Sequence, residues 1–321
     1  MQKVISFSIA AYNIESYAKQ LLDSFIDEKT MDEIEVLIIN DGSNDQTANI
    51  CQEYVNKYPN VFRLINKENG GHGSTINKGI ELAEGKYFKP IDGDDWIKTT
   101  NLVELVKVLK EYDVDIVVTD YDRIYEKSNV VDTITNNFLI KDKAIEFDLI
   151  QWKNYLHFHA VIYKTSLLRE HNIKLTEKVF YDDTEYVLYP IIYVSTVLYI
   201  PLVLYCYRLE SEGQSVSLSG FLKHKDDLKL ILINSFKFCT ENEKLVSNAK
   251  KTYFKYLQRG VLAFLYRNYL CGKYESSNQL KAYKKSTVDS LKQICGIKFY
   301  KYWFYSICRV RAALLLRKLK K

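Results

Sequence analysis

Residues 86–95 read KYFKPIDGDD, and this stretch decides the fold because it predicts a strand that ends in acidic residues. Upstream of it, β-branched runs alternate with segments whose apolar residues recur at helical spacing. We predict strands at 4–11, 34–41, 61–66 and 86–95, with helices at 16–28, 45–57 and 76–85. Strands and helices that alternate at such short intervals need crossover connections, which predicts an α/β fold with a mostly parallel central sheet.

Polar motifs follow three of the four predicted strands. They are Tyr12-Asn13 after the first, Asp41-Gly42-Ser43 after the second and Asp92-Gly93-Asp94-Asp95 after the fourth. The carboxyl ends of parallel strands meet at one edge of a sheet, and ligands of such sheets bind outside that edge. The sequence therefore predicts a ligand site built from these motifs. A glycine-rich loop, NGGHGST at 69–75, follows the third strand.

The pair Asp92 and Asp94 closes an apolar strand and suggests a metal site. Hard divalent cations such as Mn²⁺ or Mg²⁺ prefer carboxylate oxygens and often share them with substrate phosphates. A diphosphate leaving group needs its developing charge neutralised, and a cation can do this. Acidic turns are common, however, so the pair alone is a weak signal.

The set of motifs resembles family 2 glycosyltransferases. The resemblance covers roughly residues 1–215 and rests on six motifs in the order of that family: SIAAYN at 8–13, IINDGSNDQT at 38–47, NGGHGSTINKGIELAEGKY at 69–87, IDGDDW at 91–96, FYDDTEY at 180–186 and YRLESEGQSVS at 207–217. The resemblance implies a GT-A nucleotide-binding domain. It also implies a reaction that inverts the anomeric centre in one displacement.

The resemblance assigns donor-binding roles near the first three strands. Tyr12 would lie against the uracil ring of a UDP-sugar, and a tyrosine face suits stacking on a base. Asp41 would accept a hydrogen bond from the uracil imide, although a turn-forming aspartate is the plainer alternative. Gly70 and Gly71 would let the backbone approach the nucleotide, or simply serve the turn. His72 departs from what most members carry in that loop, and the resemblance gives it no role.

The acidic motif takes its roles from the same resemblance. Asp92 would contact ribose or metal, and Asp94 would be the direct metal ligand. Asp95 would lie toward the acceptor. Trp96 would form a platform for a sugar ring or belong to the core.

The catalytic base is expected in a later acidic pair at the start of a helix. By motif position Asp183 is that base, because a carboxylate within hydrogen-bond reach can take the proton of an acceptor hydroxyl. Asp182 would support it in place of the commoner glutamate. The alternative is that one of the two caps the helix, and Glu185 is the reserve candidate for the base.

Three further residues carry open alternatives. Arg208 would reach the diphosphate, since a guanidinium matches phosphate geometry, or it would form a structural ion pair. His157 and His159 flank Phe158 at alternating spacing. With no third metal ligand evident, we expect one to be buried in a strand and the other to line the acceptor site.

The charge of the chain divides unevenly along its length. Residues 221–321 hold 23 Lys and Arg against 6 Asp and Glu, whereas residues 1–220 hold 22 against 34. We predict a catalytic domain at 1–220 and a basic, aromatic-rich helical region at 221–321. The last 31 residues carry nine positive charges and no acid, which suits an anionic membrane surface or a solvated helix face. No RNA-binding signature is present, so we expect no nucleic-acid partner.

An uncharged stretch at 186–207 could be mistaken for a transmembrane helix. Pro190 and Pro201 interrupt it, and its β-branched second half predicts a buried strand. We therefore expect a cytoplasmic protein, either free or peripheral at the inner face of the cell membrane.

The expected function is inverting, metal-dependent transfer of a sugar from a UDP-sugar to a saccharide or lipid-linked acceptor in surface polysaccharide or glycoconjugate synthesis. One alternative is an inactive homologue that only binds nucleotide sugars, but it would have no need of both Asp94 and Asp183. A nucleotidyltransferase is a second alternative. It would carry a Gly-rich, basic loop after the first strand, which IAAYNIESYAK at 9–19 lacks.

Overall fold

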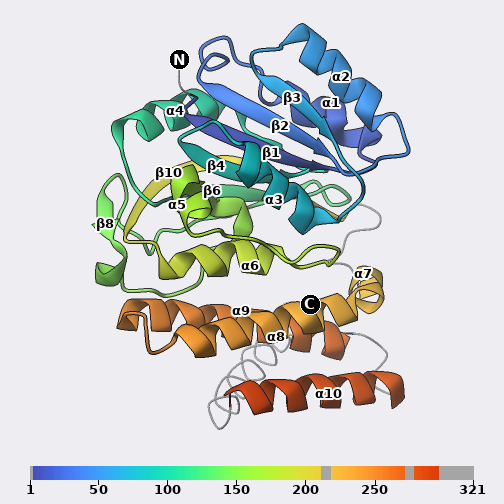
Figure 1. Ribbon diagram of the computed structural model, residues 1–321, viewed down its shortest axis with the longest axis vertical. Coiled ribbons are helices and arrows are strands. Elements are labelled where there is room, and N and C mark those ends of the chain that lie inside the picture. Colours follow the sequence, from blue (N-terminus) through green and yellow to red (C-terminus); the bar gives the residue numbers. More distant parts are fainter. Residues whose placement is uncertain (1–2, 211–217, 272–277, 296–321) are drawn as a thin grey trace. The chain divides into compact units, whose positions relative to one another are not determined.

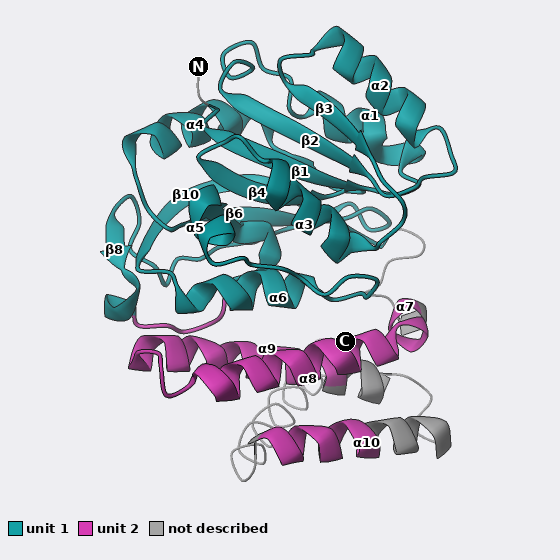
Figure 2. Cartoon of the chain, viewed as in Figure 1, with its two compact units in different colours: residues 1–150, 156–212 teal, residues 151–155, 213–321 magenta. Residues whose placement is uncertain are grey.

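The computed structural model describes residues 3–210, 218–271 and 278–295. The chain divides into two compact units, residues 1–150 with 156–212 and residues 151–155 with 213–321, coloured separately in Figure 2. Each unit is described by itself. The predicted division at residue 220 into a catalytic domain and a basic region stays a prediction.

Unit 1 is built on a mixed, mostly parallel sheet, as the sequence predicts. The order is β3-β2-β1-β4-β9-β6-β10-β5, with β7 beside β6 and β8 beside β10. Figure 1 labels β1 to β4, β6, β8 and β10 of this sheet. The strands that run in one direction are β1 Ile5–Ala11, β2 Ile34–Asn40, β3 Phe62–Asn66, β4 Tyr87–Asp92, β6 Ile116–Tyr125 and β10 Thr196–Leu209. Those that oppose them are β5 Trp96–Ile97, β7 Val130–Ile134, β8 Ala144–Glu146 and β9 Val161–Lys164.

Helices cover both faces of the sheet around β1. Successive strand residues point to opposite faces. Phe7 packs on Phe25, just past α1, with ring centroids 5.0 Å apart, whereas Ser8 meets Gly79 of α3. Helices α1 and α3 therefore lie on opposite faces. The helices of this region are α1 Glu15–Asp23, α2 Thr47–Lys57, α3 His72–Leu82 and α5 Thr165–Glu170.

The remaining helices of unit 1 are short apart from α4. They are α4 Leu102–Glu111, α6 Asp183–Leu188, and the 3-10 helices η1 Thr99–Asn101, η2 Phe147–Leu149, η3 Phe158–Ala160 and η4 Tyr189–Ile192. Strand β10 confirms the interpretation of 186–207, whose second half is a strand. No helix among the described residues is long and apolar enough to cross a membrane.

The helix predicted at 76–85 begins earlier than expected. It starts at His72 and ends at Leu82, so most of the glycine-rich segment is helical rather than loop. Gly71 has φ +81°, a backbone conformation that glycine adopts without strain. The amides of Ser74 and Thr75 donate to the Gly71 carbonyl at 3.0 and 3.4 Å. The turn at Gly71 therefore starts the helix and places His72 at its first residue.

Unit 2 is helical, in keeping with the C-terminal helical region expected from the sequence. Its helices are α7 Leu218–Lys223, α8 Lys225–Asn242, α9 Asn248–Cys271 and α10 Asn278–Cys295. Trp152, from the segment that joins this unit, meets the Tyr253 ring edge-on at 4.9 Å. Most of the basic segment at 291–321 lies outside the described residues, and so does the membrane contact predicted for it.

Candidate active site

The predicted motifs meet at one edge of the unit 1 sheet. Tyr12 directly follows β1, Asp41 follows β2, and Asp92 is the last residue of β4. Because these three strands run parallel and adjacent, their carboxyl ends lie together. The Tyr12 ring is 48% exposed and so is available for stacking. The sheet thus gathers the predicted donor-binding residues, while their roles stay predictions.

Asp41 organises the glycine-rich turn. Its Oδ1 accepts from Lys67 Nζ at 2.5 Å and from the Gly70 amide at 2.9 Å, and its Oδ2 accepts from the Gly71 amide at 2.8 Å. A buried carboxylate with three donors is well satisfied. The structure therefore brings Asp41, Gly70 and Gly71 together, as the donor-binding prediction requires. Lys67 is an additional cation at this point.

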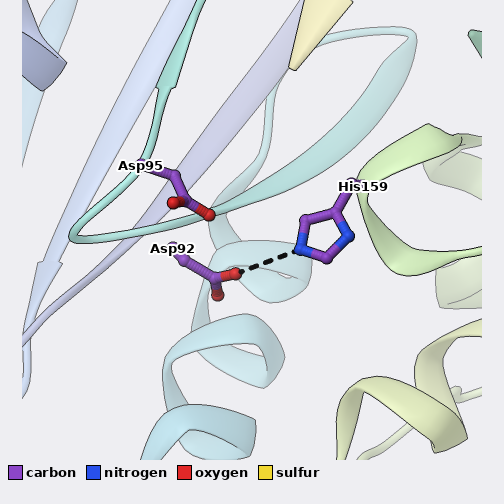
Figure 3. A group of neighbouring side chains, drawn as sticks. All are labelled: Asp92, Asp95 and His159. Atoms are coloured by element: carbon purple, nitrogen blue, oxygen red, sulfur yellow. Dashed lines mark ion pairs between the residues drawn. The ribbon is translucent and has the colours of Figure 1, made fainter. Parts of the chain in front are cut away.

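Two carboxylates and one imidazole converge at the end of β4. Oxygen or nitrogen atoms of Asp92, Asp95 and His159 all lie within 4.8 Å of one another (Figure 3). Asp92 Oδ2 and His159 Nε2 are 3.9 Å apart. Asp94, predicted as the direct metal ligand, is not a member of this group. The structure thus offers Asp92 with Asp95 and His159 as a candidate metal site beside the predicted Asp92–Asp94 pair.

The geometry of this group fits a divalent cation. Burial lowers the pKa of His159 to about 3, so its imidazole is neutral and can offer a lone pair. The 3.9 Å separation from Asp92 is too long for a hydrogen bond. It falls within the roughly 3 to 4.2 Å between two ligands of an octahedral cation. Carboxylates suit Mn²⁺, and a neutral imidazole is a common metal ligand.

Tyr205 and the backbone of Arg208 hold the carboxylates in place. The Tyr205 hydroxyl lies 2.7 Å from Asp95 Oδ2 and 3.1 Å from Asp92 Oδ2, and accepts from the Asp92 amide at 3.0 Å. The Arg208 amide donates to Asp95 Oδ1 at 2.7 Å. Burial, together with the charges of Asp94 and Asp92, raises the pKa of Asp95 well above its usual value. The protonated form of Asp95 is therefore favoured relative to that of a free aspartate.

The Arg208 side chain is engaged within the protein. Its guanidinium lies 4.8 Å from the Tyr17 ring centroid and 4.7 Å from that of Trp96. Its nitrogens donate to the Asp94 carbonyl at 2.6 Å, to Gln20 at 2.7 Å and to Glu126. These contacts favour the structural alternative for Arg208, which fixes the acidic turn. A diphosphate contact for it stays a prediction.

Lys89 places the histidine of the candidate metal site. Its side chain is fully buried in β4, and Nζ donates to the carbonyls of His159 and Val161 at 2.8 and 3.3 Å. Burial lowers the pKa of Lys89 to about 7. His159 lies in the 3-10 helix η3, not in a strand. His157 is the residue directly before that helix. The expectation that one of these histidines is buried in a strand is therefore wrong.

Asp183, predicted as the general base, lies in a buried acidic environment. Burial, and next the charge of Asp182, raises its pKa to about 7, close to the value at which a base works best near neutral pH. Asp183 begins α6, and Asp182 precedes it without a side-chain cap hydrogen bond. The side chain of Glu185, the reserve candidate, is fully buried and accepts from the Thr176 amide at 2.7 Å. Glu185 therefore anchors the preceding loop.

His72 stands between the two acidic motifs. Its Nε2 lies 2.9 Å from Asp92 Oδ1, and its Nδ1 lies 3.0 Å from Asp182 Oδ2. Burial lowers the pKa of His72, but the carboxylates of Asp182 and Asp92 outweigh it and raise the pKa well above 6.5. Each ring nitrogen thus donates to a carboxylate. In the sequence, only the departure of His72 from the pattern of the family singled this residue out.

Comparisons with solved structures identify the fold. The chain shares its fold with the solved S. aureus TarS in complex with UDP-GlcNAc: TM-score 0.65, 17% identity, 99% of this chain and 92% of that one covered. It also resembles the mannosyltransferase PcManGT from Pyrobaculum calidifontis in complex with GDP-Man and Mn²⁺. There the TM-score is 0.54 and the identity 13%, with 98% of this chain and 87% of that one covered. The fold is therefore of the GT-A type.

The sequence places the chain in one family. The model of glycosyl transferase family 2 matches residues 6–172, just over half of the chain, and the chain belongs to this family. Glycosyltransferase GlyA of Streptococcus pneumoniae is 29% identical over 231 residues, which are 66% of this chain and 31% of that protein. The chain thus spans about a third of the length of two of the curated relatives it matches.

Proposed function

We propose that the chain transfers a sugar from a UDP-sugar, with inversion, to a saccharide or lipid-linked acceptor in the synthesis of a surface polysaccharide or glycoconjugate. The observation that carries the proposal is the convergence of the β4 carboxylates with Asp183, whose pKa is raised to about 7. TarS in complex with UDP-GlcNAc supports a nucleotide-sugar donor. The membership of family 2 supports glycosyl transfer.

The donor would lie against the carboxyl ends of the first strands. The exposed Tyr12 ring stacks on the uracil, and Asp41 accepts its imide N–H. The amides of Gly70 and Gly71 already point at Asp41, so the turn between them is shaped before the donor arrives. A bound nucleoside diphosphate would therefore meet a preorganised surface, which lowers the entropic cost of binding.

The cation would be Mn²⁺ or Mg²⁺, held by Asp92 together with Asp94, or with Asp95 and His159. When bound, it supplies positive charge to the diphosphate leaving group. The mannosyltransferase relative was solved with Mn²⁺. In this chain the carboxylates of Asp92 and Asp95 and the imidazole of His159 offer three candidate ligand atoms.

Asp183 would act on the acceptor. The acceptor hydroxyl oxygen forms a bond to the anomeric carbon while the bond from that carbon to the diphosphate breaks. The hydroxyl proton passes to Asp183, and the nucleoside diphosphate leaves with the electron pair. A positioned base of this kind contributes typically 10²- to 10⁴-fold to a rate. Asp182, the residue directly before Asp183, would support the base.

The proposed setting is the cytoplasm, at the inner face of the membrane. Its basis is the nine positive charges and absence of acid in the last 31 residues. Each Lys or Arg near an anionic surface contributes about 1 kcal/mol. Co-sedimentation of the full-length protein with phosphatidylglycerol vesicles at low salt tests this part. Protein that stays in the supernatant would remove membrane contact from the proposal.

A donor panel tests the transfer itself. Purified protein is incubated with UDP-, GDP- and TDP-sugars, with Mn²⁺ or with EDTA, and nucleotide release is measured. We expect release from a UDP-sugar in Mn²⁺ and none in EDTA. Asp183→Asn should bind UDP with Mn²⁺ yet lose transfer. Binding without release in the wild type would instead support an inactive nucleotide-sugar-binding homologue.

A further inference from the structure

A single imidazole joins three segments that lie far apart in the sequence. His72 is the first residue of α3. Its Nε2 contacts Asp92 at the end of β4 at 2.9 Å, and its Nδ1 contacts Asp182, just before α6, at 3.0 Å. The His72 side chain is 29% exposed and that of Asp182 only 2%. The bridge is therefore partly shielded from water, which strengthens it.

The two glycines beside His72 let the acid-bearing loop approach. A Cβ on Gly71 would lie 3.0 Å from the Lys178 backbone, and one on Gly73 would overlap the Thr176 carbonyl oxygen. The Lys178 amide donates to the Gly70 carbonyl at 2.8 Å. Backbone contact between the two loops thus brings Asp182 to His72, and a side chain at either glycine would push the loops apart.

Asp182 in turn sets the start of α6. Its carbonyl accepts from the amides of Glu185 and Tyr186 at 2.8 and 3.2 Å. Asp183 is the next residue, so its carboxylate direction depends on how Asp182 is held. With its carboxylate fixed by His72 and its carbonyl fixed by the helix, Asp182 has little freedom to rotate.

We propose that His72 is a positioning residue that couples the donor end of the site, at Asp92, to the catalytic base, at Asp183, by holding Asp182. This inference rests on the proposed glycosyl transfer for the role of Asp183. The bridge itself rests on the observed contacts. Positioning partners of this kind typically change activity by 10- to 100-fold when they are removed.

The loop that precedes Asp182 is also held by hydrogen bonds that do not involve His72. Loss of the His72 side chain should therefore have only a local effect on the structure. Asn77 Nδ2 donates to the Leu175 carbonyl at 3.0 Å, and Asn77 Oδ1 accepts from the Leu175 amide at 2.8 Å. Glu185 accepts from both the amide and the hydroxyl of Thr176. Variants at His72 should therefore fold, with a changed placement of residues 178–183.

Two amide variants separate the halves of the bridge. The amide nitrogen of asparagine stands near the position of Nδ1, so His72→Asn can keep the contact with Asp182. That of glutamine stands near the position of Nε2, so His72→Gln can keep the contact with Asp92. His171, an exposed histidine stacked on Tyr193 at 3.6 Å, provides matched controls as His171→Asn and His171→Gln.

The readouts are kcat and donor KM in the transfer assay, together with hydrogen exchange of peptides covering residues 176–183. For His72→Gln we expect kcat to fall about 10- to 100-fold with donor KM within about threefold of the wild type. Exchange in residues 176–183 should rise. For His72→Asn we expect exchange close to that of the wild type, a smaller loss of kcat and a raised donor KM.

Each outcome decides the inference. The inference is overturned if His72→Asn and His72→Gln have the same kinetics and the same hydrogen exchange. It is also overturned if His72→Gln has the kcat and the exchange of the wild type. If the wild type turns over none of the donors, the proposed function fails, but exchange still tests the bridge. Raised exchange in His72→Gln without a rise in His72→Asn then supports the coupling by itself.

Discussion

Replacing Asp183 by asparagine should stabilise the folded protein while it abolishes transfer. The folded carboxyl keeps its proton up to about pH 7, against 3.8 for a free aspartate. The unfolded chain therefore releases this proton first, and stability falls as pH rises from about 4 to about 7. Asparagine carries no charge, so Asp183→Asn avoids this loss. It can also still accept from the Thr184 amide, a contact of 2.9 Å in the wild type.

The size of the gain follows from the pKa shift. A shift of roughly three units corresponds to about 4 kcal/mol at 1.36 kcal/mol per unit. The side chain of Asp183 keeps some contact with solvent, so relaxation and water lower the realised gain to about 1–2 kcal/mol. For a unit of this size, each kcal/mol moves Tm by about 2–4 °C. We expect a rise of about 2–8 °C at pH 8, and almost none at pH 4.

The measurement is thermal unfolding of both proteins from pH 4 to pH 8 in EDTA, because a cation would stabilise the wild-type carboxylate. Asp182→Asn is the matched comparison, one residue away. It should lower stability by about 1.5–3 kcal/mol because it removes a charged hydrogen-bond partner of His72. A gain for Asp183→Asn that is the same at pH 4 and pH 8, or none at pH 8, would refute the reasoning.

Three further outcomes are expected. The kcat/KM for transfer should rise with pH as Asp183 loses its proton and level off at or above about pH 7; a midpoint clearly above 7 contradicts this. Gly73→Ala should lower the free energy of unfolding by about 1–3 kcal/mol, because its Cβ meets the Thr176 carbonyl; an unchanged Tm contradicts it. The affinity for Mn²⁺, measured by electron paramagnetic resonance, should fall at least tenfold in His159→Ala if the cation binds the cluster of Figure 3. If only Asp94→Asn lowers the affinity, the Asp92–Asp94 pair is the metal site instead.

The first four strands of the sheet could be predicted from the sequence because their signals are local, whereas the short opposing strands β5, β7, β8 and β9 were not predicted. The buried run at 34–40 is β2, in which every residue is buried, and the strand-end motifs follow from the topology. Helix boundaries were less accurate. The start of α3 at His72 depends on the left-handed turn at Gly71 and on contact with residues 176–178, and periodicity carries no information on either.

The site could be predicted only where a motif carried it. Asp92, Asp182 and Asp183 belong to family motifs, and the structure brings them near one another. His159 lies near Asp92 only because of the tertiary structure. The buried Lys89 of β4 donates a hydrogen bond to the backbone carbonyl of His159. Spacing in the sequence cannot reveal a ligand placed in this way. The same is true of His72, whose two partners lie 20 and 110 residues away along the chain.

Two carboxyl groups of this site hold a proton more tightly than a free aspartate does. Asp95 and Asp183 both have a raised pKa because each is buried near other carboxylates. A divalent cation bound by Asp95 would favour the ionised form of this side chain, since a ligating carboxylate must be ionised. The same added positive charge would lower the pKa of Asp183. A cation at the donor end would therefore favour the ionised form of Asp183, which is the form that the proposed base needs, and the His72 bridge would hold Asp182 beside it.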